Sequence, residues 1–178
     1  MNHSKKLCIG IALVMMAVFT ANLYAQKADQ SKNNQFSFGA ACLVALSDDT
    51  VSVGPSLQFS WLNPRLFRNF IGLGVHAGLI VPIGEYSGYG ATLIAGPAMT
   101  VFDNGLFRIP ITLGAHADFV MFMEIADRWV WNIGAGTVAD FVWHFGTKWY
   151  AYGRVQMACN FGEFEFLITP GLGMGFSW

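Results

Sequence analysis

A hydrophobic period of two is the feature of this sequence that most constrains its fold. In residues 51–61, Val, Val, Pro, Leu, Phe and Trp alternate with Ser, Gly, Ser, Gln and Ser. Successive side chains of a β-strand point to opposite faces, so this pattern predicts a strand with one apolar face and one small or polar face. The same pattern predicts eight strands in all, at 36–46, 51–61, 71–82, 91–102, 107–122, 129–143, 149–161 and 164–178.

The segments between the predicted strands are rich in turn-forming residues. Gly, Pro, Asn, Asp and Ser favour turns, and they recur at each boundary. The turn signals are 47–50, Asn63-Pro64, 84–88, Asp103-Asn104-Gly105 and Gly146. The connections are short, as expected for consecutive antiparallel strands.

The few charges of the sequence indicate which face of each strand meets which environment. Only 12% of the residues are charged, against about 25% in ordinary globular domains. When the apolar face of every predicted strand is taken as the outer face, no charged residue lies on it. A soluble barrel has the opposite arrangement, whereas a lone charge facing the lipid midplane costs about 2–4 kcal/mol. We therefore expect an all-β fold, an antiparallel up-and-down eight-stranded transmembrane β-barrel; a soluble β-sandwich with a large core is the alternative.

The first 34 residues have a different composition. Lys5 and Lys6 precede an apolar run over 7–19, and small residues follow as far as Ala25, which is the order of a cleavable secretory signal. We expect a signal peptide at 1–25, a polar periplasmic leader at 26–34 and the barrel at 35–178; an uncleaved N-terminal anchor is the alternative. Loss of both lysines changes the net charge from −1 to −3, so the mature chain has no electrostatic attraction to nucleic acid.

Large aromatic residues are expected at the ends of the strands. Trp and Tyr concentrate at both membrane interfaces of spanning proteins, where their amphipathic rings lie at the level of the lipid headgroups. Five tryptophans fall at predicted strand ends: Trp61, Trp129, Trp131, Trp143 and Trp149. The chain also stops within its last strand, on the aromatic residue Trp178, so the last strand can pair with the first and remove both edges.

With these features, residues 35–178 resemble the small eight-stranded outer-membrane barrels of the OmpA/OmpX/OmpW kind. The C-terminal tail is similar to the signal read by the outer-membrane insertion machinery, with Gly173, Phe176 and Trp178 at its glycine and aromatic positions. Gly171 stands where that signal prefers a polar residue. The resemblance implies outer-membrane localisation, contact with the insertion machinery, and both termini in the periplasm. It also implies that the short, mostly acidic connections at 47–50, 83–89, 123–128 and 161–163 face outside.

The inward face holds the candidate site, a polar network in the barrel interior (the lumen). Pairing about the 123–128 connection places Asp118 opposite Asn132 and Arg108 diagonal to Asp140. The segments 71–77 (IGLGVHA) and 111–117 (ITLGAHA) are an internal repeat that places His76 and His116 at matching positions near mid-strand. No serine motif accompanies them, so we expect no catalytic residue, no metal site and no cofactor. An eight-stranded barrel is just wide enough for side chains to fill it. The predicted network comprises His76, Arg108, His116, Asp118, Asn132, Asp140, Arg154 and Glu165.

Two further expectations concern cysteines and prolines. Cys42 and Cys159 face outward on the first and seventh strands, so about two strand spacings of ~4.8 Å separate them. That exceeds the ~7 Å limit between the Cα atoms of a disulfide, and we expect free thiols. Pro55, Pro97 and Pro170 lie inside strands of a fold that has no edge, and we expect β-bulges there.

The sequence leaves three functions open. The leading hypothesis is a monomeric, non-enzymatic outer-membrane barrel with a structural or interaction role in the envelope, surrounded by outer-membrane lipid. One alternative is a narrow channel for small or apolar solutes, which the OmpW side of the resemblance implies. The other is a soluble periplasmic ligand-binding barrel.

Overall fold

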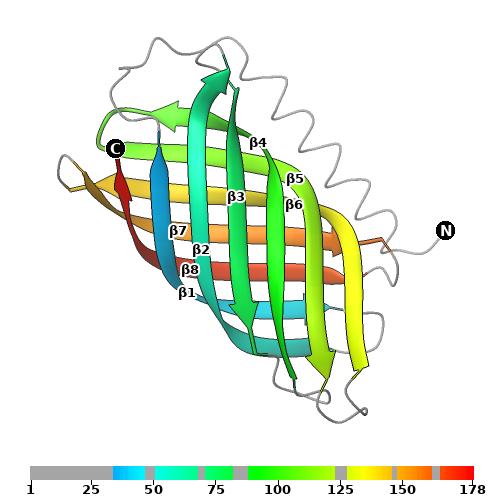
Figure 1. Ribbon diagram of the computed structural model, residues 1–178. Helices are drawn as coiled ribbons and strands as arrows, with labels where there is room; N and C mark the ends of the chain where they lie inside the picture. Colours follow the sequence, from blue (N-terminus) through cyan, green and yellow to red (C-terminus); the bar gives the residue numbers. More distant parts are fainter. Residues whose placement is uncertain are drawn as a thin grey trace. The chain divides into compact units, whose positions relative to one another are not determined.

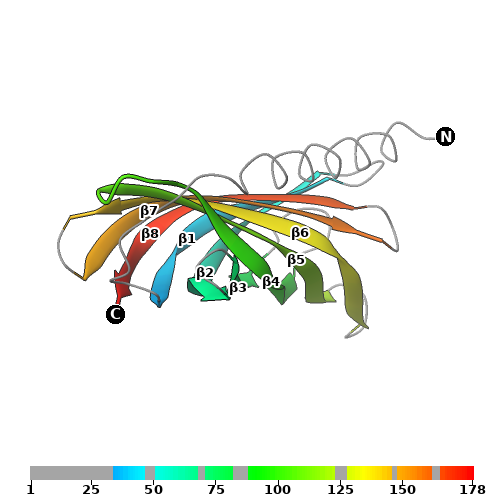
Figure 2. The ribbon, with the colours of Figure 1, turned by 90° about the horizontal axis from the view of Figure 1, so that it is seen from above.

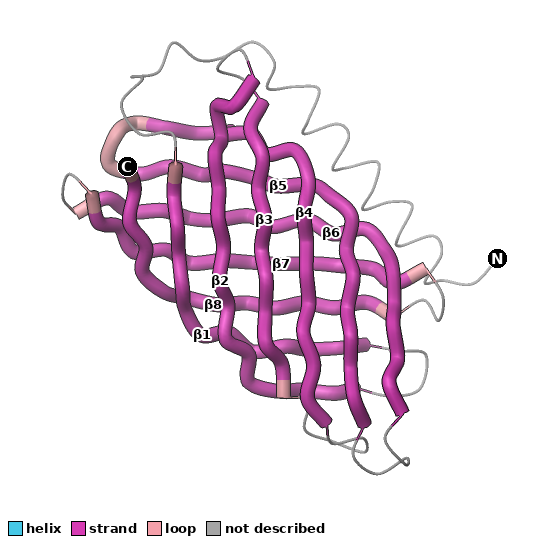
Figure 3. Tube along the Cα trace, viewed as in Figure 1, coloured by secondary structure: helices cyan, strands magenta, loops and turns pink. Residues whose placement is uncertain are grey.

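Eight strands make up nearly all of the described chain in this computed structural model (Figures 1 and 3). The structure describes residues 34–46, 51–67, 71–81, 88–122, 128–145, 148–161 and 165–178, without the side chains of 64–67, 88, 122, 128 and 129. The expected signal peptide, nearly all of the expected leader and most of the expected external connections lie outside these residues. The strands are β1 (Gln35–Leu46), β2 (Val51–Phe67), β3 (Ile71–Ile80), β4 (Gly88–Asp103), β5 (Phe107–Phe122), β6 (Arg128–His144), β7 (Trp149–Asn160) and β8 (Phe166–Ser177).

The strands form a closed antiparallel barrel in sequence order. Each strand pairs with its neighbours along the chain, and β1 pairs with both β2 and β8. The predicted all-β, up-and-down, eight-stranded barrel is therefore confirmed. No helix within the described part of the chain is long and apolar enough to cross a membrane.

The pairing register fixes the tilt of the strands. A path that starts at Phe36 and steps from partner to partner around the barrel returns to β1 at Leu46, ten residues further on. With a rise of ~3.3 Å per residue and a spacing of ~4.8 Å, a stagger of ten over eight strands gives a tilt of about 40°. Strands on the two sides of the barrel therefore cross each other in projection (Figures 1 and 2).

The prediction of bulges at Pro55, Pro97 and Pro170 was wrong. All three stay in register, and each is paired on one side, with Cys42, Leu73 and Val155 respectively. With the neighbouring strand on its other side, each proline has no pairing partner. The register does not shift at any of the three, so no extra residue is inserted. A missing amide donor on one side therefore costs one ladder bond and needs no bulge.

Register shifts occur at two other places. One lies between Asn63 and Phe67, where β2 runs past Pro64 although a turn was expected at that proline. The other lies between Thr100 and Phe102, opposite Pro110. Both shifts lie next to a proline, although not at any of the three prolines for which bulges were expected.

The connection between β4 and β5 is the expected Asp-Asn-Gly turn. Gly105 has a φ of 84°, in the left-handed region that favours glycine. The side chain of Asn104 accepts hydrogen bonds from the backbone amides of Leu106 and Phe107, at 3.1 and 2.7 Å. Side-chain acceptors of this kind are why Asp and Asn initiate turns.

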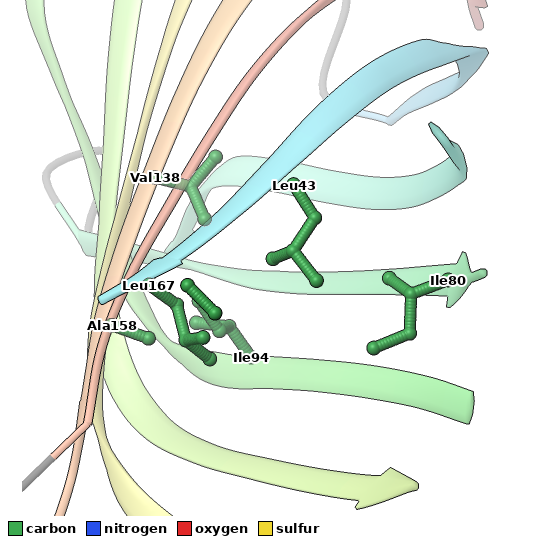
Figure 4. Close-up of a cluster of buried hydrophobic side chains, with 7 residues drawn as sticks. Leu43, Ile80, Ile94, Val138, Ala158 and Leu167 are labelled. Carbon is green, nitrogen blue, oxygen red and sulfur yellow. The ribbon is translucent and has the colours of Figure 1, made fainter. Parts of the chain in front are cut away.

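Inward side chains fill the barrel with both apolar and polar groups. An apolar cluster lies toward the end at which β3 finishes and β8 begins, called here the loop end (Figure 4). Its members come from six strands: Leu43, Ala45, Ile80, Ile94, Val138, Ala158 and Leu167. Polar side chains occupy much of the remaining interior, toward the end that carries Gln35 and Ser177, called the terminal end.

Candidate functional site

The outer face of the barrel is apolar across its middle. Exposed large side chains such as Phe59, Leu93 and Ile133 lie at the outward positions of their strands, with exposed fractions of 41%, 44% and 68%. Monomeric soluble proteins rarely expose a contiguous apolar surface of this extent. The outer face is therefore suited to an apolar environment.

Aromatic side chains border this apolar face at both ends. Aromatic pairs twelve residues apart lie along three neighbouring strands: Phe107 and Phe119 on β5, Trp131 and Trp143 on β6, and Trp149 on β7 with Phe161 directly after it. At a tilt of about 40°, twelve residues of ~3.3 Å each span about 30 Å along the barrel axis, close to the thickness of a bilayer core.

Ring contacts link these residues around the barrel. Phe107 lies 4.9 Å from Trp143 at the terminal end, and Phe119 lies 4.2 Å from Trp131 at the loop end, centroid to centroid. Trp61 was expected at a strand end, yet β2 continues six residues beyond it. The side chain of Trp129 lies outside the described residues.

Arg154 is the centre of the polar network in the lumen. Its Nε and Nη2 donate to the two carboxylate oxygens of Asp140, at 2.6 and 3.0 Å. Nη2 also donates to the hydroxyls of Ser37 and Ser60, at 3.1 and 2.7 Å. The guanidinium carbon lies 4.6 Å from the ring centre of Tyr152. These five residues come from β1, β2, β6 and β7, so one side chain connects half of the strands.

Arg108 lies apart from Arg154. The sequence predicted that Arg108 lies diagonal to Asp140 on β6. The pairing agrees, because Arg108 is opposite Val142, two residues from Asp140. Its ion pair, however, is with Asp103 of β4, with Nε and Nη2 each 2.8 Å from Oδ2. The extra residue of the β4 bulge brings Asp103 directly opposite Arg108, whereas Asp140 is already paired with Arg154.

A second polar group lies toward the loop end. Nδ2 of Asn160 donates to Asp118 Oδ2 at 2.7 Å and to Glu165 Oε2 at 3.1 Å. Nε2 of His116 lies 3.3 Å from the same Asp118 oxygen. Asn132 is opposite Asp118 on β6, as the hairpin register predicted, and is half-buried. The structure thus brings three of the predicted residues together here around Asn160, which was not among them.

His76 lies between these two groups. Its Nε2 is 3.0 Å from the hydroxyl oxygen of Thr112. A histidine beside a hydroxyl has the residue types of a base and a nucleophile. The two residues are only 2% and 1% exposed, so the pair forms a buried hydrogen bond.

The site contains no grouping suited to metal binding within the described ranges. No three His, Cys, Asp or Glu side chains there lie close enough together to hold an ion. No disulfide joins Cys42 and Cys159, as predicted. The contacts observed among the described lumen side chains are hydrogen bonds, ion pairs and apolar packing.

Several residues of the lumen were not predicted as site residues. They are uncharged hydroxyl, phenol and amide side chains: Ser37, Ser60, Thr112, Tyr150, Tyr152 and Asn160. The sequence did indicate that these residues point inward, because they alternate along their strands in step with the predicted charged residues. The serines are short, and only the closure of the barrel brings them near Arg154.

The fold and the lumen define an eight-stranded, up-and-down β-barrel whose interior is filled by side chains, an architecture shared with outer-membrane proteins. Three solved structures show this likeness. Neisserial surface protein A has 9% sequence identity and a TM-score of 0.69, and the attachment invasion locus protein of Yersinia pestis has 12% and 0.62. The N-terminal β-barrel domain of Pseudomonas aeruginosa OprF has 14% and 0.55. Each match covers 84% of this chain and 100% of the other. No protein-family model and no curated protein sequence matches the chain.

Proposed function

We propose that the chain is an integral outer-membrane protein. The observation that carries this proposal is the outer face of the barrel, which is apolar across its middle and bordered by aromatic rings about 30 Å apart. A lipid bilayer covers such a face on all sides at no cost in charge burial. The likeness of the fold to outer-membrane barrels supports the same location.

Within the envelope, the protein has a structural or interaction role and acts as a monomer without enzymatic activity. Support comes from the lumen, where an apolar cluster packs among polar groups that bind one another. The insertion machinery of the outer membrane is the expected assembly partner. It would read Phe176 and Trp178, whose rings stack at 5.3 Å at the end of β8.

Fractionation of cells that express the full chain tests the location. A membrane barrel remains in the membrane pellet through high salt, is extracted by detergent, and shifts its gel mobility on boiling. Recovery in the osmotic-shock fraction without detergent would support the soluble periplasmic ligand-binding barrel instead.

A narrow channel is the second candidate. It is favoured by buried polar atoms that have no hydrogen-bond partner among the described residues, such as Gln58 Oε1, His76 Nδ1 and Tyr152 Oη. Water bridges such groups in other proteins, and a chain of waters can form a path. The apolar cluster around Ile94 opposes conduction because it interrupts any such path.

Planar-bilayer recording separates the two candidates. The closed barrel gives no steady single-channel openings with purified, refolded protein. Openings of fixed amplitude that scale with the amount of protein would establish the channel, and heat-denatured protein is the control for detergent artefacts.

A further inference from the structure

The seam between β1 and β8 is the junction at which the two ends of the chain close the barrel. On its β2 side, β1 is paired without interruption from Gln35 to Leu46. On its β8 side, the ladder omits Cys42 and Leu43, opposite Pro170 and Thr169. Pro170 has no amide to donate across this seam. The seam is thus the weaker of the two ladders that hold β1.

Side chains of β7 reach across β8 to the far side of this seam. The hydroxyl of Tyr150 donates to the backbone carbonyl of Phe36 on β1, at 3.0 Å. Arg154 Nη2 donates to Ser37 on β1 and to Ser60 on β2. Both donors are on a strand that has no ladder with β1, and each hydrogen bond spans the seam from inside the lumen.

Glycines on β8 make this reach possible. Gly173 and Gly175 point inward beneath the β7 side chains. A Cβ at Gly175 would collide with the ring of Tyr150, and one at Gly173 would lie 2.7 Å from Tyr152 Oη. A side chain at Gly175 would therefore displace the bridging ring of Tyr150.

We propose that Tyr150 and Arg154 form a latch that holds the β1–β8 seam closed from inside the lumen. The latch adds hydrogen bonds to the seam at Phe36 and Ser37, five residues along β1 from the gap in its ladder at Cys42. Without it, β1 and β8 are the first strands to separate. The inference does not depend on the proposed location of the protein, because it rests only on contacts within the barrel.

Hydrogen–deuterium exchange of the refolded full chain in detergent micelles tests the latch. Tyr150→Phe removes one hydroxyl and keeps the ring, and Ser37→Ala removes one acceptor of Arg154. Each change is expected to speed exchange in peptides of β1 and β8 by about tenfold, the effect of losing one buried hydrogen bond. Peptides of β3 to β5 should keep their exchange rates.

Thr112→Val is the matched control. It removes another lumen hydrogen bond, that of His76 with Thr112, which spans β4 in the way that the latch spans β8. Its effect should be confined to β3, β4 and β5. Equal acceleration of all strands in the three variants, or unchanged β1 and β8 in Tyr150→Phe, would overturn the proposal.

Discussion

Arg154 and Asp140 form a two-point ion pair inside the barrel, with Nε 2.6 Å from Oδ1 and Nη2 3.0 Å from Oδ2. The two side chains are 1% and 7% exposed. Both charges have lost nearly all contact with solvent, so each depends on the other. A buried pair of this kind stabilises little relative to an apolar pair, yet loss of one partner is costly.

Asp140→Asn should therefore destabilise the barrel by about 3–5 kcal/mol, because it leaves the Arg154 charge uncompensated. The double variant Asp140→Leu with Arg154→Met removes both charges, so its free energy of unfolding should fall by less than that of the single variant. Urea unfolding in detergent micelles, followed by the heat-dependent gel shift, measures both. A double variant less stable than Asp140→Asn would contradict this reading of the pair.

The lumen glycines give a second prediction. Gly39→Ala places a Cβ against the Leu172 carbonyl and Tyr152 Oη, and it should cost about 1–3 kcal/mol, as overpacking does. Gly153→Ala is the control, since a Cβ there meets no atom within 4 Å. It should be neutral or slightly stabilising, because alanine has less backbone freedom to lose on folding. The same unfolding assay compares them, and equal losses would contradict the crowding argument.

The outer face should show a depth-dependent cost of charge. In the proposed membrane location, Leu57 lies well inside the bilayer, whereas Val51 is the first residue of β2 and lies near the interface. Leu57→Arg should destabilise the barrel in lipid vesicles by about 2–4 kcal/mol, against about 0–1 for Val51→Arg near the interface. Reversible unfolding of the vesicle-inserted protein by guanidinium, read from tryptophan fluorescence, gives both values. Similar costs at the two positions would argue against a lipid-facing surface.

The apolar cluster gives a prediction about packing. Ile94 is fully buried in the lumen, and Ile94→Ala should cost about 2–5 kcal/mol through the cavity that it leaves. Leu93→Ala on the adjacent outward position is the control, because lipid chains fill the space that the side chain vacates. A larger loss for Leu93→Ala than for Ile94→Ala would reverse the assignment of the two faces.

The cysteines give a chemical test of the strand order. Cys42 and Cys159 are not joined by a disulfide, and β8 separates the strands that carry them. Peptide mapping of protein purified without reductant should yield both as unlinked, alkylated peptides. A peptide that joins the two through a disulfide would mean that β1 and β7 are neighbours and that the barrel order is wrong.

The strands were largely predictable from local sequence. Seven of the eight end within three residues of the predicted boundaries, because alternation and turn residues act over a few positions. The exception is β2, which passes through Pro64. A proline normally marks a turn there, but the adjacent strand β3 provides pairing as far as Phe67.

The polar network was predictable only as a set of inward residues. Asp118 opposite Asn132 followed from one hairpin, a short-range relationship. The ion-pair partner of Arg108 could not be predicted in this way, because an extra residue in β4 places Asp103 opposite Arg108. Ser37, Ser60 and Tyr150 became partners in the lumen through contacts between strands distant in sequence.

The sequence by itself determined the eight strands, the side of each strand that is apolar, and the absence of charge on that side. These properties depend on the alternation of side chains between the two faces of one strand, which is set by neighbouring residues. The tertiary structure alone decided the stagger of ten residues between Phe36 and Leu46 and, with it, which inward groups meet. Closure of a barrel fixes that stagger by pairing the first strand with the last, so residues more than a hundred positions apart come within hydrogen-bond distance.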